Sequence, residues 1–257
     1  MVRLSSQPRE KFKGKRVGSP FPVYPHEVSD QMIVSDTIIR VPNYAVTGIV
    51  PDAGDVVKVF DIDGGDTDAI IKIRKACRLA KRVLSAACDF AAPGISTDDI
   101  DVFVFQLITE AGAYPSTLNY LGYPKSVCTS VNEVACHGIP DKRPLQDGDV
   151  LSIDVACYLN GFHGDTCATV IIDGGNEDNE IFERAAHLVS STKAALSAGI
   201  EACQPGGCLS DIGEAIHVVA DAQRLQSTRD GGGHGIHSHF HCAPLVKVCL
   251  QNSDHIP

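Results

Sequence analysis

Two aspartates lie where they could bind a metal ion together. Asp154 belongs to an alternating run at 150–159 and Asp165 to a second run at 162–172, and Asn160-Gly161 separates the runs. Asn-Gly between two alternating runs is the strongest short-range signal for a β-hairpin. The sequence therefore predicts that both carboxyl groups project from one hairpin.

A two-residue loop sets the register of this hairpin. Asp154 then lies opposite Cys167, and Asp165 lies opposite Ala156. The period of two places the aspartates on one face, in diagonal positions about 7–8 Å apart. Paired carboxylates repel unless one is protonated or a cation lies between them. The sequence is compatible both with a metal site and with two aspartates that face solvent. A three-residue loop would no longer place the two aspartates on one face.

Histidines add a second class of metal ligand. His137 lies in the stretch 136–141, which closes the first predicted hairpin. His234 lies in the glycine-rich stretch 231–235, where backbone approaches a ligand closely. His237, His239 and His241 follow at alternate positions. A single histidine is more typical of a surface or a core, and this run raises metal binding to an equal alternative, so both interpretations stay open. Imidazole combined with carboxylate suits Mn, Co, Fe or Zn.

The elements that must position these groups follow from periodicity. Apolar spacings of three and four predict a helix over 66–90, and Ser96 is a predicted N-cap for a helix that runs to 111. We expect a loop at 114–123 and a first hairpin with limbs at 126–131 and 134–137. Two further helices are expected at 179–199 and 209–223, followed by loop and strand over 231–257. This order predicts the α+β class.

Composition narrows the class of protein. The chain has 257 residues and a net charge of −10, which argues against a nucleic-acid binder with a basic surface. It contains no apolar run long enough to cross a membrane. Ten cysteines without a CxxC pair, and no apolar signal-peptide core, favour reduced thiols in an intracellular compartment. We expect residues 1–45 to form an extended arm or a targeting leader.

The stretch 125–166, KSVCTSVNEVACHGIPDKRPLQDGDVLSIDVACYLNGFHGDT, resembles the signature of type 1 methionine aminopeptidases. The likeness runs over 41–257, and VPNYAVTGIVPDAGD with YPKSVC resembles the mitochondrial branch. The resemblance implies the pita-bread fold, two α+β halves around a dinuclear metal site, over 46–257. It also implies removal of the initiator methionine from nascent chains when the second residue is small.

The resemblance assigns roles by position. It implies that Asp154, Asp165 and His234 are metal ligands, which agrees with the hairpin geometry. His137 and His241 would be the catalytic groups that hydrogen-bond the substrate near the scissile amide. Two divalent ions, Co, Mn, Fe or Zn, would activate the water that attacks the peptide bond.

Three further residues would line the methionine pocket by the same resemblance: Tyr123, Cys128 and Phe240. Soft and aromatic walls suit a thioether. Cys128 as a nucleophile is the competing hypothesis, which we reject because a metal can supply the activated water.

The implied partner is the N-terminal methionine of nascent polypeptides, with the ribosome as a further candidate. We expect a monomer, without a membrane partner or sequence-specific nucleic acid. The branch resemblance favours mitochondria and leaves the cytoplasm open.

The sequence departs from the family in two ways. The family's two later glutamate ligands have no counterpart, because no Glu follows Glu214, and His237 replaces the last glycine of Gly-His-Gly-Ile-Gly. We therefore expect an incomplete second half that lacks its C-terminal strands, weak metal affinity, low activity and a distorted loop at His234. A catalytically inactive pita-bread protein that binds nascent chains or another partner is the alternative. An X-Pro peptidase of the same fold is a third hypothesis.

Overall fold

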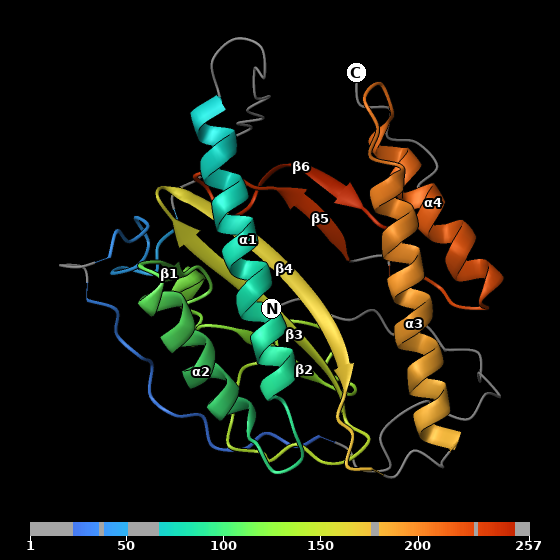
Figure 1. Ribbon diagram of the computed structural model, residues 1–257, viewed down its shortest axis with the longest axis horizontal. Coiled ribbons are helices and arrows are strands. Elements are labelled where there is room, and N and C mark those ends of the chain that lie inside the picture. Colours follow the sequence, from blue (N-terminus) through green and yellow to red (C-terminus); the bar gives the residue numbers. More distant parts are fainter. Residues whose placement is uncertain (1–22, 36–38, 51–66, 176–179, 229–230, 250–257) are drawn as a thin grey trace, which may run out of the picture.

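The computed structural model describes residues 23–35, 39–50, 67–175, 180–228 and 231–249 (Figure 1). The helices are α1 Thr67–Phe90, α2 Thr97–Glu110, the single-turn η1 Tyr120–Gly122, α3 Glu180–Glu201 and α4 Leu209–Ala222. The strands are β1 Tyr114–Pro115, β2 Cys128–Val131, β3 Val150–Leu159, β4 Phe162–Ile171, β5 Gly232–Gly235 and β6 Cys242–Lys247. The α+β class and the four long predicted helices are confirmed. The predicted leader falls mostly outside the described residues.

The hairpin that carries the aspartates has the predicted register. β3 and β4 pair antiparallel, with Leu159 opposite Phe162 and Asp154 opposite Cys167. The other edge of β3 pairs with β1 near one end and with β2 near the other. Asp154 therefore lies between two neighbouring strands, in the middle of the sheet.

Helix α1 covers the face of the sheet that the aspartates do not use. Its buried stripe includes Leu79, Val83 and Leu84, and it joins the core residues Ile153 and Val155 of β3. A Cβ atom on Gly164 of β4 would lie 2.4 Å from backbone of α1, so only glycine allows this close approach. Alternation along β3 and β4 then turns both aspartates away from α1.

The prediction that residues 134–137 form the second strand of a first hairpin is wrong. These residues form no strand, and β2 pairs with β3 instead. His137 has a φ of 53°, in the left-handed region that interrupts an extended strand. The predicted loop at 114–123 contains the two-residue β1 and the single turn η1.

Helices α3 and α4 pair beside the sheet, and the β5–β6 ribbon lies near them (Figure 1). A Cβ atom on Gly199 of α3 would lie 2.9 Å from the Ile216 side chain of α4, so glycine lets these helices pack closely. Few residues of this region are buried, and Ile200, Val218 and Leu245 remain more than half exposed. Its helices and strands therefore contribute little to the main core.

Part of the N-terminal arm packs on the folded body. Residues 23–35 have no regular secondary structure. Further along, Ile39 and Tyr44 are buried in a second apolar cluster with Tyr114 and Tyr158. The domain boundary at residue 46 stays a prediction, although residues 39–45 take part in this cluster.

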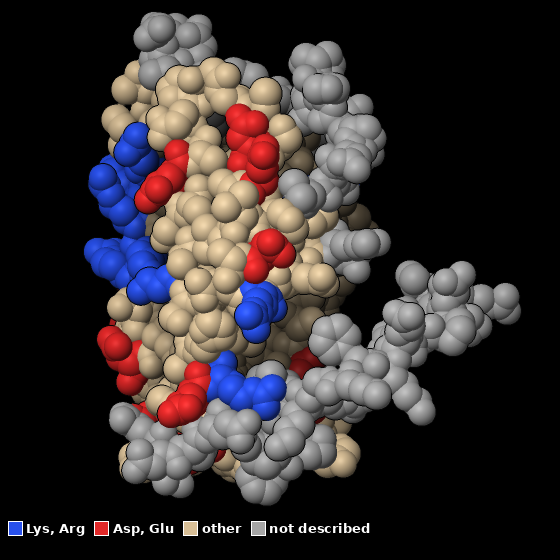
Figure 2. Space-filling view, turned by 90° about the vertical axis from the view of Figure 1, so that its right-hand side faces the viewer, with Lys and Arg blue, Asp and Glu red and all other residues tan. Residues whose placement is uncertain are grey.

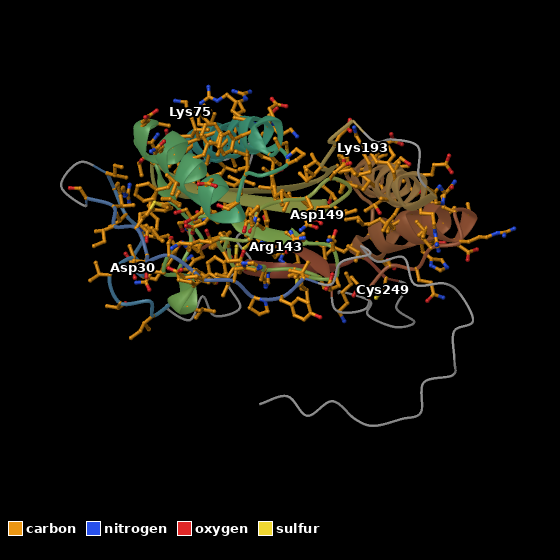
Figure 3. The ribbon with its side chains drawn as sticks, turned by 90° about the horizontal axis from the view of Figure 1, so that it is seen from below. Asp30, Lys75, Arg143, Asp149, Lys193 and Cys249 are labelled. Atoms are coloured by element: carbon orange, nitrogen blue, oxygen red, sulfur yellow. The ribbon has the colours of Figure 1, made fainter. Side chains whose placement is uncertain are left out.

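Charge is distributed unevenly over the surface. Helix α1 carries five exposed cations: Arg74, Lys75, Arg78, Lys81 and Arg82. Lys75 lies on the outer side of the helix layer in Figure 3. Figure 2 shows most of the Lys and Arg of the face in view along one edge of the molecule, with others nearer its centre. The positive charge of α1 therefore lies across the sheet from the two aspartates.

The ten cysteines, all of which lie within the described residues, form no disulfide bond with one another. Among the helices of the described ranges, none has the length and apolarity needed to cross a membrane.

Candidate active site

The carboxyl groups of Asp154 and Asp165 interact directly on the open face of the hairpin. Burial and the neighbouring charge of Asp165 raise the pKa of Asp154 to about 7. Two carboxylates held this close resist joint ionisation unless a proton or cation is shared. The pair is therefore an acceptor for a proton or a divalent cation.

His234 brings an imidazole to this pair from β5. Its Nε2 atom lies 3.4 Å from an oxygen of Asp165, and its Nδ1 atom lies 2.9 Å from the carbonyl oxygen of Gly235. The contact with Asp165 raises the pKa of His234. A Cβ atom on Gly235 would lie 2.2 Å from the carbonyl oxygen of Ala243, so glycine permits the tight β5–β6 approach beside His234.

His241 and Phe240 lie just before β6, in the loop that follows His234. The ring centroids of His234 and His241 are 4.3 Å apart, and Phe240 is buried against His241 at 4.4 Å. Burial and the nearby His234 lower the pKa of His241 to about 4. At neutral pH His241 is therefore an uncharged imidazole, with one donor and one acceptor nitrogen.

His137 reaches the site on a loop fixed by its glycine neighbour. A Cβ atom on Gly138 would lie 2.2 Å from the carbonyl oxygen of Thr129, and the amide of Thr129 donates to Gly138 over 2.9 Å. The hydroxyl of Tyr123 donates to the same Gly138 carbonyl over 2.8 Å. Strand β2 and Tyr123 thus hold the loop that presents His137.

One cavity of about 650 Å³ collects these groups. Seven of the eight predicted site residues line it: Tyr123, Cys128, His137, Asp154, Asp165, Phe240 and His241. The eighth, His234, contacts Asp165 at its edge. The structure therefore brings together all eight predicted site residues, from β2, β3, β4, β5 and three loops.

Sequence reasoning missed Tyr120. It lines the cavity, and its hydroxyl oxygen lies 2.8 Å from Nδ1 of His241. The available signal was its place three residues before Tyr123, in the same segment as the predicted pocket wall.

The thiol of Cys128 is buried, and burial raises its pKa to about 12. A protonated thiol is a poor nucleophile. This property supports the assignment of Cys128 to the cavity wall rather than to attack on the substrate.

Among the residues that the structure describes, no three His, Cys, Asp or Glu side chains converge closely enough to enclose a metal ion. The donors themselves suit a divalent cation, because Asp154 and Asp165 form a like-charged pair and His234 lies beside it. The residues therefore fit one side of a metal centre.

The loop that contains His237, for which the sequence predicts a distortion, is attached to the sheet. Its carbonyl oxygen accepts a hydrogen bond of 2.9 Å from the amide of His163, in β4. The ring of His237 packs against Phe162, with centroids 5.1 Å apart. His237 therefore ties the histidine loop to the start of β4.

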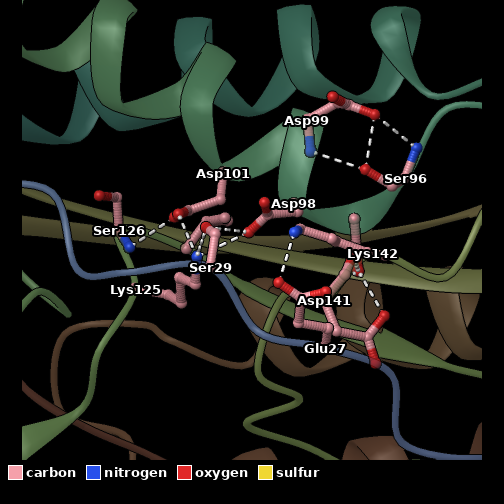
Figure 4. A network of polar contacts seen from close by, with 12 residues as sticks. Glu27, Ser29, Ser96, Asp98, Asp99, Asp101, Lys125, Ser126, Asp141 and Lys142 are labelled. Atoms are coloured by element: carbon pink, nitrogen blue, oxygen red, sulfur yellow. Dashed lines mark hydrogen bonds and ion pairs between the residues drawn. The ribbon is translucent and has the colours of Figure 1, made fainter.

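An ion network surrounds the buried side chain of Lys125, just before β2 (Figure 4). Lys125, only 1% exposed, contacts Asp98 at 2.6 Å and Asp101 at 3.5 Å. It also donates to the hydroxyl of Ser29 over 2.6 Å, and Asp101 accepts from the amide of Ser126. Because Lys125 and Ser126 lead into β2, the network fixes the strand that carries Cys128.

The arm is also bonded to the loop of His137. The side chains of Glu27 and Lys142 pair at 2.6 Å (Figure 4). The amide of His26 donates to Asp141 over 3.1 Å. The amide of Val23 donates to Glu133 over 2.7 Å. The arm thus contacts the loop of His137 near both of its ends, at Glu133 and at Asp141–Lys142.

The family model for metallopeptidase family M24 matches residues 71–255. The chain belongs to family M24. The match covers Asp154 and Asp165, the loops that carry His137 and His241, and strands β2 to β6.

Relatives narrow the resemblance within M24. The chain is 41% identical over 245 residues to methionine aminopeptidase 1B, chloroplastic, of Arabidopsis thaliana, covering 95% of this chain and 63% of the relative. It is 45% identical over 216 residues to methionine aminopeptidase 1D, mitochondrial, of Mus musculus, covering 84% and 61%. The chain spans between 52% and 63% of the curated relatives' lengths.

Solved structures of methionine aminopeptidases are also similar to this chain. Methionine aminopeptidase from Rickettsia prowazekii superposes with a TM-score of 0.68 at 37% identity, over 74% of each chain. A prolidase from Pyrococcus furiosus shares the fold, with a TM-score of 0.59 at 18% identity, over 72% of this chain and 52% of the prolidase. The pita-bread fold of this M24 chain is confirmed. Its similarity to methionine aminopeptidases favours that group over the X-Pro peptidases.

Proposed function

We propose that this M24 chain carries the site with which a methionine aminopeptidase removes the initiator methionine from a nascent polypeptide. The observation that carries the proposal is one cavity that joins a carboxylate pair to two histidines and a soft apolar wall. The names of the relatives support the enzyme over an inactive binding protein.

The carboxylate pair and His234 would hold the divalent metal that family M24 implies. When bound, such a metal supplies Lewis-acid activation of water and of the scissile carbonyl. Asp154 and Asp165 would contribute oxygen ligands and His234 a nitrogen ligand, a set that suits Mn, Co, Fe or Zn. Which metal occupies the site, and whether two ions bind, belongs to this proposal.

His137 and His241 would bind the substrate at the scissile amide. Because His241 is uncharged at neutral pH, it can donate one hydrogen bond to an oxygen that gains negative charge. His137 lies on the loop that Tyr123 and β2 hold, and would contact the same amide from another side of the cavity.

Tyr123, Cys128 and Phe240 would recognise the methionine side chain. The hydroxyl of Tyr123 is engaged with backbone carbonyls, and the thiol of Cys128 keeps its proton. The cavity wall therefore offers polarisable, uncharged groups. A thioether makes favourable contacts with such sulfur and aromatic groups.

Location and partners extend the proposal. Relatives named mitochondrial or chloroplastic support an organelle, and mitochondria are favoured. Binding to the ribosome and a monomeric state remain parts of the same proposal. Co-fractionation of the tagged protein with purified mitochondria tests the location.

Metal binding and peptide cleavage test the site separately. Titration calorimetry with Mn²⁺ should give weak binding that Asp154→Asn and His234→Ala abolish. Asp173→Asn is the matched control, because Asp173 is an exposed aspartate just after β4. Equal binding by all the variants would exclude the proposed ligands.

The cleavage assay uses saturating Mn²⁺ with the peptides Met-Ala-Ser and Leu-Ala-Ser. We expect slow release of methionine, little release of leucine, and loss of both in Asp165→Asn. No release of methionine by the wild-type chain, or undiminished release by Asp165→Asn, would contradict the proposal.

A further inference from the structure

Tyr120 belongs to a partition between two cavities. Tyr120, Phe240 and His241 line both the 650 Å³ cavity and a second cavity of about 220 Å³. Within this partition the hydroxyl oxygen of Tyr120 lies 2.8 Å from Nδ1 of His241. This distance is a short hydrogen bond, so the two side chains are coupled.

The direction of this hydrogen bond decides the chemistry of His241. A neutral imidazole has one nitrogen that donates and one that accepts. Burial raises the pKa of Tyr120, so its hydroxyl keeps the proton that it can donate. In the described part of the chain, the structure gives this hydroxyl no other hydrogen-bond partner. Donation from Tyr120 to Nδ1 leaves the imidazole proton on Nε2.

The ring of Tyr120 is held from both sides. Tyr44, from the N-terminal arm, packs edge-on against it with centroids 5.1 Å apart, and Phe240 packs edge-on at 5.0 Å. Tyr44 is itself buried, and its hydroxyl donates to the carbonyl oxygen of Ser116 over 2.6 Å. These contacts restrict the ring before any substrate binds, which lowers the entropic cost of holding His241.

The backbone around Tyr120 adds a second, independent observation. Asn119 and Leu121, on either side, have φ values of 57° and 52°. Left-handed φ values at residues other than glycine cost energy and concentrate at sites with a function. The side chain of Asn119 also donates to the carbonyl oxygen of Ala45 in the arm. The arm therefore supports the strained turn that carries Tyr120.

We propose that Tyr120 is a positioning residue that donates its hydroxyl proton to Nδ1 of His241 and so holds the proton of that imidazole on Nε2. The Nε2–H group is then the only donor of the ring, and it serves the cavity that His241 lines. The catalytic meaning of this arrangement rests on the proposed function, whereas the arrangement itself does not.

Long-range ¹H–¹⁵N correlation spectra of histidine-labelled protein test the proposal without substrate. Above neutral pH, we expect the Nε2–H form of His241 in the wild-type chain. Tyr120→Phe should give a mixture of the two neutral forms. Tyr123→Phe is the matched control, because Tyr123 lines the same cavity and hydrogen-bonds backbone instead of His241.

Two outcomes would overturn the proposal: the Nδ1–H form in the wild-type chain, or an unchanged Nε2–H form in Tyr120→Phe. The wild-type spectrum decides the first outcome even if the variant does not fold. Tyr44→Phe keeps the aromatic brace and should leave the His241 spectrum unchanged.

Peptide cleavage separates this inference from the proposed function. With Met-Ala-Ser, Tyr120→Phe should lower kcat about tenfold, the equivalent of one hydrogen bond, with KM nearly unchanged. If the wild-type chain releases no methionine but shows the Nε2–H form, the proposed function fails and the positioning role stands. If cleavage is found with the Nδ1–H form, only the positioning role fails.

Discussion

The two sides of the candidate site rest on regions with very different burial. Asp154 and Asp165 extend from a sheet whose inward residues, including Ile153 and Val155, are completely buried under α1. His234 lies in β5 and His241 directly precedes β6, a strand in which Leu245 is 62% exposed. The carboxylates are therefore fixed by the main core. The positions of the His234 and His241 rings depend instead on a few contacts, such as those to Asp165 and Tyr120.

Breaking the buried ion network should have the largest effect. Lys125→Met would leave Asp98 and Asp101 without their buried cation and should lower the free energy of unfolding by about 3–5 kcal/mol. Denaturant unfolding measures this loss. Lys142→Met is the control, because its ion pair with Glu27 is exposed and its loss should leave the midpoint nearly unchanged. Equal midpoints for the two variants would contradict the role of the network.

A pair of core and surface truncations compares the regions directly. Ile153→Ala should cost about 2–5 kcal/mol, because it opens a cavity in a fully buried position. Leu245→Ala on β6 should change the free energy of unfolding by no more than about 0.5 kcal/mol. Chemical denaturation checks both values. A large loss for Leu245→Ala would show that the second region is packed more firmly than its exposure indicates.

The pH dependence of stability should report the buried carboxyl of Asp101. Burial raises its pKa from 3.8 to about 6. Because the folded state then binds the proton more tightly than the unfolded chain, this contribution to stability is present below about pH 4 and is lost as the pH rises to about 6.

Thermal unfolding across this pH range measures the effect. Asp101→Asn should flatten the curve between pH 4 and 6, whereas Asp173→Asn should not. Asp98 does not produce the same signal, because hydrogen bonds from Lys125 and Ser29 outweigh its burial and lower its pKa. An identical slope in Asp101→Asn and wild type would refute the assignment.

Hydrogen exchange should show the smallest and most local difference. Amides of β3 should exchange only on global unfolding, whereas those of β5 and β6 should exchange by local opening. Mn²⁺ should slow exchange in β5 if it joins His234 to the carboxylate pair, and should not do so in His234→Ala. Equal protection of the β3 amides and the β5 and β6 amides, measured without metal, would contradict the difference in stability between the two regions.

Local pattern predicted a large part of this structure. The Asn160-Gly161 turn specified the register of β3 and β4 because a two-residue loop leaves one pairing that keeps the apolar face together. The Ser96 cap began α2 as predicted, and the structure adds a reciprocal bond between Ser96 and Asp99. The family signature also named eight residues that the structure gathers at one site.

Other features could not be read from the sequence. The segment 134–137 has β-rich composition, but the left-handed His137 and the contact of Gly138 with Thr129 prevent a strand. Tyr120 has an ordinary local sequence, and only the packing of Tyr44 and Phe240 around it brings its hydroxyl to His241. Both outcomes depend on contacts between residues distant in the chain.

The sequence by itself determined the α+β class and the hairpin register, because turn chemistry and side-chain period act over short distances. The family and the predicted site residues came instead from the resemblance of the stretch 125–166 to a known signature. The tertiary structure alone decided how the arm braces the site, how Lys125 is buried and which neighbour orients His241. These features arise from burial and from distances between separate elements, which no local pattern encodes.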